Sequence, residues 1–488
     1  MRAAALVLVA ASLASAQMRV IAQPGKSPLV TFRVVFTTGA MADPADKPGL
    51  AYLTAHLLAE GGTRTMTYRQ VVDALFPMAA GVDVQVDKEM TTFSGATHVD
   101  NLNGYYQVLH DMLLDPGWRQ EDFARVREDA INAIRVGLRS NDEELGKEVL
   151  YQNIFAGTPY GHYDGGDVSA LERITLDDVK NFYHGEYSQS HLMLGIAGGY
   201  PPDFVDRVKK DFRTLPESAG FRPREEWAKP IERTRVVIVE KDTRSVAISL
   251  GFPIALTRQQ PDYAALLVAT SYLGQHRMSS GLLYREMREK RGLNYGDYAY
   301  IEYFPRGMYL MEPEPNLMRQ FQIFQIWVRP VEPTNAKFAL RLALYELDKL
   351  IQNGISQADF ERTREFLTKY VNVLTRTRSA ELGYAIDGVY VDQPDYNTYL
   401  KEHLAKLTRA DVNAAIRRYL RTDRLVIAMV AKNGEALKKE LASPDASPMT
   451  YNSPKPAPVM EEDKTVEKWP LGLRVEDITV VKGETVFE

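Results

Sequence analysis

Residues 174–197, ITLDDVKNFYHGEYSQSHLMLGIA, have a counterpart 233 residues later in residues 407–430, LTRADVNAAIRRYLRTDRLVIAMV. In each copy a threonine, Thr175 or Thr408, precedes a helical pattern with an aspartate in its first turn, which suits the positive end of a helix. A strand-like apolar run follows each helix. Unrelated helix–strand units can share these features, but the long spacing favours two duplicated domains over a solenoid, whose repeats span about 20 to 50 residues.

A linker is predicted between the two copies, at residues 216–234, where proline and glycine accompany dense charge. It separates an N-terminal domain at 17–215 from a C-terminal domain at 235–443. Both halves mix strand-like and helix-like segments without strict alternation, which favours the α+β class. We therefore expect two homologous domains, each with a mixed or antiparallel sheet and helices packed on it. The Pro-rich residues 444–488 are predicted to form an extended arm that lies on a domain or on a partner.

The composition excludes several classes of protein. The chain of 488 residues is 45% hydrophobic and 25% charged, so it can bury large cores and is not disordered. Its formal net charge of −5 gives no electrostatic basis for binding nucleic acid. The chain has no cysteine, which excludes disulfides, thiolate zinc sites, iron–sulfur clusters and thiol nucleophiles. A metal site would have to use histidine and carboxylate ligands.

The first 16 residues have the three parts of a secretory signal peptide. Arg2 gives a positive start, residues 3–13 are almost wholly apolar, and residues 14–16 (ASA) form a cleavage site of the A-x-A type. The apolar run is shorter than the roughly 20 residues that span a bilayer, which argues against a membrane anchor. We expect an exported protein that starts near Gln17 and has no membrane span in the mature chain. The absence of cysteine suits the bacterial periplasm, and an extracellular location is the alternative.

A helical stretch between glycines, residues 49–63 (GLAYLTAHLLAEGGT), resembles the zinc helix of the insulinase/pitrilysin metallopeptidases. That helix carries the inverted motif H-x-x-E-H, in which two histidines on one face bind zinc and the glutamate activates a water molecule. Here Tyr52 and Ala55 stand at the positions of the first histidine and the glutamate, and only the second histidine is present, as His56. A phenol is a poor zinc ligand, and alanine cannot accept a proton.

The resemblance places the family's third zinc ligand, a glutamate, on a helix that matches residues 123–135. By this alignment the ligand position holds Ile134. We therefore predict a degenerate site and no zinc in this chain. His56 is expected to be a structural residue, and a weak metal pair formed by His56 and Glu60 is the alternative.

Residues 273–295 (LGQHRMSSGLLYREMREKRGLNY) resemble a segment of the family's C-terminal half in which a Ser-Ser turn opens a helix. In the family, an arginine of this segment holds the substrate backbone, and a tyrosine seven residues later supports the tetrahedral oxyanion. Both act on the zinc site of the opposing half. The resemblance assigns these roles to Arg288 and Tyr295. An ordinary charged helix with an ion pair between Glu286 and Lys290 is the alternative.

A candidate peptide-binding strand completes the resemblance. In the family an extended substrate adds to an edge strand of the sheet, where main-chain hydrogen bonds give affinity with little demand on sequence. The residues that resemble this strand are Ala80, Gly81, Val82, Asp83 and Val84. No G-x-S-x-G motif, P-loop or dinucleotide-binding glycine motif offers a different chemistry.

The resemblance covers residue 30 to about residue 433 and implies two domains that form a clam-like shell. We predict an exported, zinc-less family member that acts as the non-catalytic, substrate-binding and oxyanion-supporting subunit of a heterodimeric zinc peptidase, similar to processing-peptidase-like enzymes. The expected partner is a zinc-bearing paralogous subunit, and the expected substrates are extended peptides. The alternatives are a homodimer, an inert scaffold or peptide-binding protein of the same fold, and an active peptidase with an unusual metal site.

Overall fold

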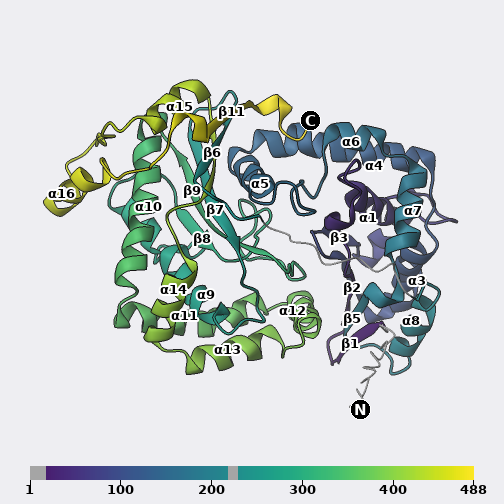
Figure 1. The fold of residues 1–488 in the computed structure, drawn as a ribbon. Helices are drawn as coiled ribbons and strands as arrows, with labels where there is room; N and C mark the ends of the chain where they lie inside the picture. Colours follow the sequence, from purple (N-terminus) through teal and green to yellow (C-terminus); the bar gives the residue numbers. More distant parts are fainter. Residues whose placement is uncertain (1–17, 218–228) are drawn as a thin grey trace, which may run out of the picture.

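Each half of the chain forms one sheet, and the two sheets share a strand order in this computed structural model (Figure 1). The structure describes residues 18–217 and 229–488. The first sheet has the order β1-β5-β2-β4-β3, and the second has the order β11-β6-β10-β7-β9-β8. Apart from β11, each strand of one sheet has a counterpart in the other. The pairs β1–β5 and β6–β10 are parallel, and the pairs that follow them in each order are antiparallel. These mixed sheets with helices packed on them confirm the predicted α+β fold of two homologous halves.

The first half alternates short strands and helices. Its elements are β1 (Arg19–Pro24), β2 (Leu29–Phe36), α1 (Leu50–Glu60), α2 (Tyr68–Leu75), β3 (Asp83–Val86), β4 (Thr91–His98), α3 (Leu102–Leu114), α4 (Gln120–Asn132), the π-helix η4 (Ala133–Leu138), α5 (Asp142–Ile154), α6 (Val168–Arg173), α7 (Leu176–Glu186), β5 (Leu192–Gly198) and α8 (Phe204–Phe212).

The second half repeats this plan and adds a C-terminal segment. Its elements are β6 (Arg235–Glu240), β7 (Val246–Ile254), α9 (Tyr263–Gly274), the π-helix η6 (Tyr284–Glu289), β8 (Asp297–Tyr300), β9 (Gln322–Val331), α10 (Ala336–Asn353), α11 (Gln357–Leu374), α12 (Arg378–Tyr390), α13 (Tyr396–Lys406), α14 (Arg409–Tyr419), β10 (Val426–Ala431), α15 (Gly434–Ala442), α16 (Ala457–Val466) and β11 (Ile478–Lys482).

The repeated sequence forms the same helix–strand unit in both halves. Thr175 accepts a hydrogen bond from the backbone N–H of Asp178 at 3.2 Å, and Thr408 accepts one from Asp411 at 3.3 Å. Each aspartate in turn accepts from its threonine N–H, so α7 and α14 both begin with a complete capping box. The strands that follow, β5 and β10, occupy equivalent places in the two sheets.

The two halves exchange one helix each. Helix α5 of the first half packs on β7 and β10 of the second sheet, and α12 of the second half packs on β5 and β2 of the first. The approach of α12 requires glycine at position 195 of β5, because a Cβ there would lie 2.8 Å from the Ile386 side chain. Each sheet therefore completes its packing with a helix from the other half.

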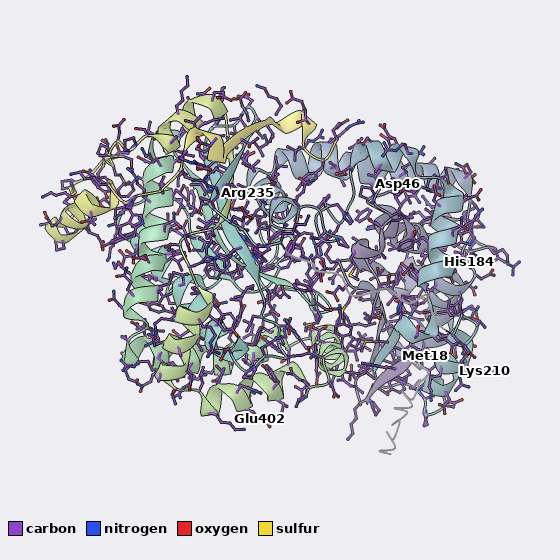
Figure 2. All side chains as sticks on the ribbon, viewed as in Figure 1. Met18, Asp46, His184, Lys210, Arg235 and Glu402 are labelled. Atoms are coloured by element: carbon purple, nitrogen blue, oxygen red, sulfur yellow. The ribbon has the colours of Figure 1, made fainter. Side chains whose placement is uncertain are left out.

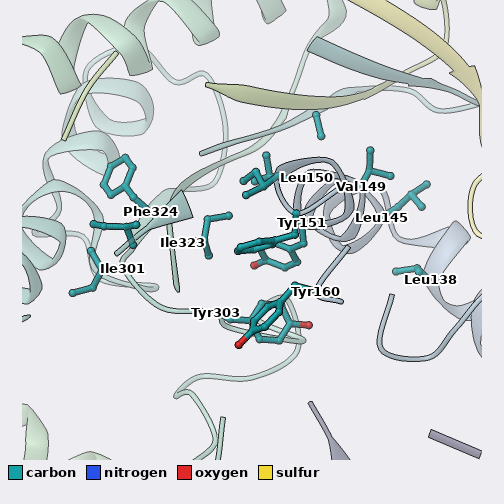
Figure 3. Packing of buried hydrophobic residues seen from close by; sticks show 14 of the residues in the cluster. Leu138, Leu145, Val149, Leu150, Tyr151, Tyr160, Ile301, Tyr303, Ile323 and Phe324 are labelled. Carbon is teal, nitrogen blue, oxygen red and sulfur yellow. The ribbon is translucent and has the colours of Figure 1, made fainter. Parts of the chain in front are cut away.

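The side chains of α5 join the core of the second half. Figure 3 shows Leu150 and Tyr151 on the side of this helix toward Ile323, and Leu145 and Val149 on the side toward Leu138. The Tyr151 hydroxyl donates to the amide oxygen of Gln325 at 2.7 Å, and its ring meets the ring of Tyr303 edge to face at 4.7 Å. Burial of apolar side chains contributes most of the favourable free energy of such contacts, so α5 ties the two halves together.

The C-terminal segment differs from the prediction of an extended arm in one part, which is helical. Residues 457–466 form α16, with Pro458 in its first turn. The N–H groups of the first turn have no partner within a helix, so proline, which lacks this group, costs no hydrogen bond there. Prolines that suggested extended chain therefore begin a helix. Strand β11 then adds to the second sheet beside β6, and the following residues reach the first half. There the backbone N–H of Val168 donates to the Phe487 carbonyl at 3.0 Å, and Arg139 donates to the Glu488 carboxylate at 2.7 Å.

Some of the predicted segments fall outside the described residues. They are the signal peptide at residues 1–16 and residues 218–228 of the predicted linker. Among the helices that the structure describes, none combines the length and the hydrophobicity that crossing a bilayer requires. Exposed polar side chains, for example Asp46, His184, Lys210, Arg235 and Glu402, lie on both halves (Figure 2).

Candidate functional site

A cavity of about 330 Å³ lies between the two halves, and Tyr52 and His56 of the predicted degenerate zinc site line it. The first half contributes α1, β3, η4, α5 and the turn at residues 163–165, and the second half contributes the β8–β9 loop. The residues that line the cavity are Tyr52, His56, Val84, Gln85, Val86, Ala133, Gly137, Leu138, Glu144, Glu148, Tyr163, Asp164, Gly165, Tyr303, Pro305, Arg306, Tyr309, Glu314 and Leu317.

The start of α1 is held by a single carboxylate. Asp43 accepts hydrogen bonds from the backbone N–H groups of Gly49 and Ala51, both at 2.7 Å, and so satisfies two free donors at the positive end of the helix. Gly49 has a φ of 96°, which glycine adopts without strain, and the helix ends at Gly61. This geometry directs Tyr52 and His56, one turn apart, into the cavity.

His56 contacts two side chains of its own helix segment. Its Nδ1 lies 3.0 Å from the Glu60 carboxylate, and its ring stacks on Tyr52 with the centroids 4.0 Å apart. The hydrogen bond to His56 lowers the pKa of Glu60, whereas burial raises the pKa of Tyr52 to about 12. The Tyr52 phenol therefore stays neutral at physiological pH and lacks the negative charge that would make it a useful zinc ligand. Ala55 is fully buried and has no proton-accepting group.

The third ligand position lies in the π-helix η4. Ala133 and Gly137 of this helix line the cavity, whereas Ile134 is 1% exposed and does not. The wider turn of a π-helix changes which side chains share a face, so an alignment that assumes α-helical spacing can shift by one residue here. Ala133 lines the cavity together with Tyr52 and His56, whereas Ile134 is buried in the core, and neither side chain has a ligand atom.

The residues of this site do not fit a catalytic zinc ion. One histidine, a neutral phenol and two methyl groups stand where the family has two histidines and two glutamates. Within the described part of the chain, one group of three carboxylates is close enough to share a cation, namely Glu286, Glu346 and Glu462. It lies outside the cavity, and Lys349 and Arg291 each approach Glu462 to 2.9 Å, so cationic side chains already occupy it.

Two acidic residues of α5 form a further wall of the cavity that we did not predict. Glu144 forms an ion pair with Lys147 at 2.6 Å and accepts from the Met308 backbone N–H at 2.9 Å. Glu148 accepts from the Tyr303 hydroxyl at 3.2 Å, and burial, followed by the charge of Asp164, raises its pKa to about 8. Their spacing of four residues on a helix was visible in the sequence, but the α5 contacts that bury them were not.

Arg288 and Tyr295 lie side by side, outside this cavity. The Arg288 guanidinium donates to the Tyr295 backbone carbonyl at 2.8 Å and lies over the rings of Tyr284 and Tyr295, 4.9 and 5.5 Å from their centroids. Tyr295 is 74% exposed. Within the described chain its hydroxyl has no hydrogen-bond partner, so both donors are open to another molecule.

The π-helix that carries Arg288 is anchored by Arg291, which the sequence did not single out. The Arg291 guanidinium is fully buried, and it donates to the Glu286 carbonyl at 2.9 Å, to Asp463 at 2.8 Å and to Glu462 at 2.9 Å. Because both acids belong to α16, the C-terminal segment fixes the position of η6 and so of Arg288.

The predicted peptide-binding strand is present but starts later than expected. Strand β3 covers Asp83 to Val86 and lies at one edge of the first sheet, pairing with β4 alone among the described strands. Ala80, Gly81 and Val82 precede it, and the Gly81 carbonyl accepts from the Tyr105 hydroxyl at 2.9 Å. Of the five predicted residues, only Val84 lines the cavity, together with Gln85 and Val86.

The family of the chain follows from these features and from its sequence matches. Residues 19–163 match the family described as insulinase (peptidase family M16), and residues 173–367 match the domain described as peptidase M16 inactive domain. The chain belongs to the M16 insulinase family. Its broken motif, with Tyr52 and Ala55 in place of ligand and base, makes it a member without the family's zinc-binding set.

The relatives of this M16 chain include one protein named a non-peptidase homolog and one named a peptidase subunit. A protein from Helicobacter pylori named non-peptidase homolog YmxG is 20% identical to this chain. The match spans 83% of this chain and 89% of the H. pylori protein. A probable mitochondrial-processing peptidase subunit beta from Arabidopsis thaliana is 22% identical to this chain. That match spans 51% of this chain and 47% of the Arabidopsis protein.

Solved structures agree with the M16 fold. The crystal structure of a peptidase M16 inactive domain from Pseudomonas fluorescens has a TM-score of 0.74 at 20% identity, and covers 85% of this chain and 95% of its own. The periplasmic protease PqqL from Escherichia coli has a TM-score of 0.65 at 15% identity, over 93% of this chain and 49% of its own. At these identities the likeness shows the fold alone.

Restoring the ligands should create a zinc site. Without changes, we expect the purified chain to hold no stoichiometric zinc and to hydrolyse no peptide. The triple variant Tyr52→His, Ala55→Glu, Ala133→Glu should bind about one zinc ion per chain, because two histidines and a glutamate complete a structure-matched ligand set. Zinc content by mass spectrometry after dialysis measures the result, with circular dichroism to confirm folding.

The matched control replaces the last change with Ile134→Glu. This side chain is buried away from the cavity, so the control should take up no zinc. Equal zinc uptake by the two triple variants would show that η4 does not present its side chains as described, and uptake by neither folded variant would reject the whole site.

Proposed function

We propose that the chain is the non-catalytic, substrate-binding subunit of a two-chain zinc peptidase, with extended peptides as substrates. The observation that carries the proposal is the open donor pair of Arg288 and Tyr295, in a chain whose own site lacks ligands and base. A guanidinium presents several fixed donors that suit peptide carbonyls, and a phenol can donate to the oxygen on which negative charge develops. These donors contribute to hydrolysis only if another chain supplies the zinc and the base.

The substrate-binding part of the proposal rests on β3. An edge strand can pair with an extended peptide through its main chain, and Val84, Gln85 and Val86 of this strand lie at the cavity wall. The Arabidopsis relative is named a subunit of a processing peptidase, which supports an assembly of paired chains.

An inert shell is the second candidate, and one contact favours it. The Gln85 side chain of β3 donates to the Pro315 and Asn316 carbonyls, both at 3.2 Å, so the β8–β9 loop already covers part of the peptide-binding edge. The name of the H. pylori relative, non-peptidase homolog, agrees with this candidate as well.

The test is reconstitution with a zinc-bearing M16 chain, to be sought in the genome of the source organism by its intact H-x-x-E-H motif. We expect the two chains to co-elute on size-exclusion chromatography, and the pair to hydrolyse an unfolded peptide that neither chain cleaves alone. A zinc-bearing chain that is fully active without this one would favour the inert shell.

We also propose that the protein is exported, to the periplasm or to the outside of the cell. The supporting observation is the signal-peptide pattern of residues 1–16. Cleavage after Ala16 predicts a mature protein that begins at Gln17. Amino-terminal sequencing of the protein purified from its native host measures this, and a mature chain that retains residues 2–16 would contradict export by this route.

A further inference from the structure

A second cavity, of about 100 Å³, lies wholly within the second half of the chain. It is enclosed by α9, β8, α11, α12, α13 and the β8–β9 loop. The proposed function assigns no role to this cavity, and the donor pair of Arg288 and Tyr295 does not line it.

The duplication places this cavity at the position that the degenerate zinc site has in the first half. Helix α9 corresponds to α1, and β8 corresponds to β3 in the common strand order. Leu267, Thr270 and Ser271 of α9 line the cavity with the spacing that Tyr52, Ala55 and His56 have on α1. The same architectural position therefore holds an imidazole and a phenol in one half, and a leucine with two hydroxyl side chains in the other.

One part of the wall of the second cavity is apolar and deeply buried. Ile301, Phe304, Leu367 and Val371 are each at most 3% exposed. Leu267 is only partly buried, although both of its neighbours in α9 are fully buried. This exposure agrees with its place in the cavity wall. A well-formed apolar cavity of this kind is the usual setting for a small ligand.

Charges in the cavity wall are already paired. The buried Arg258 guanidinium donates to Glu302 at 2.9 Å and to Asp387 at 3.3 Å, so it has both of its carboxylate partners. By contrast, the Ser271 and Tyr384 hydroxyls have no hydrogen-bond partner within the described chain, although these residues are 6% and 2% exposed. Buried hydroxyls normally have partners, and here a bound molecule could supply one.

Three residues separate this cavity from the cavity between the halves. Tyr303, Glu314 and Leu317, all in the β8–β9 loop, line both. A molecule that fills the smaller cavity would therefore support the loop that forms the second-half wall of the larger one.

We propose that the second-half cavity binds an uncharged, compact molecule with an aromatic or branched aliphatic body and one hydroxyl group. The volume suits a body of about one six-membered ring, since an engineered apolar cavity of about 150 Å³ in another protein binds benzene. The paired charges disfavour an ionic ligand, and the hydroxyl of Ser271 or of Tyr384 can bond the one polar group of the ligand. The proposal holds whether or not the chain has a zinc-bearing partner.

Phenol is the probe for the test, applied to the full-length mature chain. For a ligand of this size we expect a Kd on the order of 0.1 to 1 mM, measured by calorimetry and by ligand-observed NMR. Benzoate, which has the same ring but carries a charge, should bind at least about tenfold more weakly, because burial of an unpaired carboxylate is costly. A crystal soaked with 4-bromophenol should show bromine between Leu267 and Val371.

Two variants locate the site. Leu267→Phe fills the cavity and should abolish phenol binding, whereas Ser271→Ala removes one hydroxyl and should weaken it severalfold. The matched control is Leu29→Phe, the same change at an exposed position, which should leave phenol binding unaltered. If Leu267→Phe unfolds the chain, the 4-bromophenol soak decides. No phenol binding by folded wild-type protein, undiminished binding by folded Leu267→Phe, or bromine found elsewhere would overturn the proposal.

Discussion

Tyr295→Phe is expected to lower kcat on the order of 100-fold in the reconstituted two-chain enzyme, with little change in KM. The substitution keeps the ring under the Arg288 guanidinium and removes only the hydroxyl. That hydroxyl is proposed to donate to the substrate oxygen when it becomes an oxyanion, so its loss affects the transition state more than the bound substrate. Because the side chain is 74% exposed, neither folding nor assembly should change.

The neighbouring tyrosine supplies the matched control. The ring of Tyr284 also lies beside the Arg288 guanidinium, so Tyr284→Phe removes a hydroxyl of similar environment and should leave kcat unaltered. Arg288→Ala should raise KM and also lower kcat, since it removes donors that position the peptide. Steady-state kinetics on complexes verified by size-exclusion chromatography measure all three. Full activity of an intact complex that carries both Tyr295→Phe and Arg288→Ala would eliminate the divided active site.

Arg319→Met is expected to lower the free energy of unfolding by about 3 to 5 kcal/mol. Arg319 is 3% exposed and connects the halves: its Nε donates to the Asp87 carboxylate at 2.9 Å, Nη2 approaches Asp164 at 3.4 Å, and the guanidinium stacks on Tyr303 at 3.6 Å. The substitution leaves the fully buried Asp87 carboxylate without its cation, which is the costly outcome for a buried pair. Urea unfolding at pH 7 measures the loss.

The pH dependence separates a lost charge partner from lost packing. In the wild-type protein burial already raises the pKa of Asp87 to about 6, although the charge of Arg319 lowers it. Loss of Arg319 raises this pKa further, so the folded variant binds the additional proton over a wider pH range. Stability of the variant should then fall as pH rises, and the loss relative to wild type should be smaller at pH 5 than at pH 8. The control Arg306→Met removes an exposed ion pair with Glu314 and should cost at most about 1 kcal/mol. A loss of similar size in both variants, or one independent of pH, would contradict this account.

The fold could be predicted because its evidence is local and occurs twice. Thr175 with Asp178 and Thr408 with Asp411 are capping residues within one turn of helix, and their repetition indicated the duplication before any long-range contact was known. The broken zinc motif was equally local, since Tyr52, Ala55 and His56 share one helix. The pairing of Arg288 with Tyr295 followed from a long matching segment, and the structure places the two in contact.

What was missed depends on contacts between distant segments. The burial of Glu144 and Glu148 arises only because α5 packs on the second sheet, which their own half of the sequence does not indicate. The third ligand position was placed on Ile134 because the π-helical turn of η4 has no clear sequence pattern, whereas the cavity is lined by Ala133. No motif in the sequence marked the β8–β9 loop, yet its residues form walls of both cavities.

The exchange of α5 and α12 has a consequence for how the protein is made. Helix α5 leaves the ribosome with the first half, but the strands on which it packs, β7 and β10, are synthesised much later, at residues 246–254 and 426–431. Until then the apolar surface of α5, which is nearly all buried in the folded protein, has no strands to pack on. The face of the first sheet that α12 covers is likewise exposed until α12 has been synthesised. The nascent chain should therefore stay dependent on chaperones until synthesis is almost complete. If the gene is split between the halves, each fragment expressed alone should be insoluble. The two fragments should fold into a soluble complex only when they are expressed together.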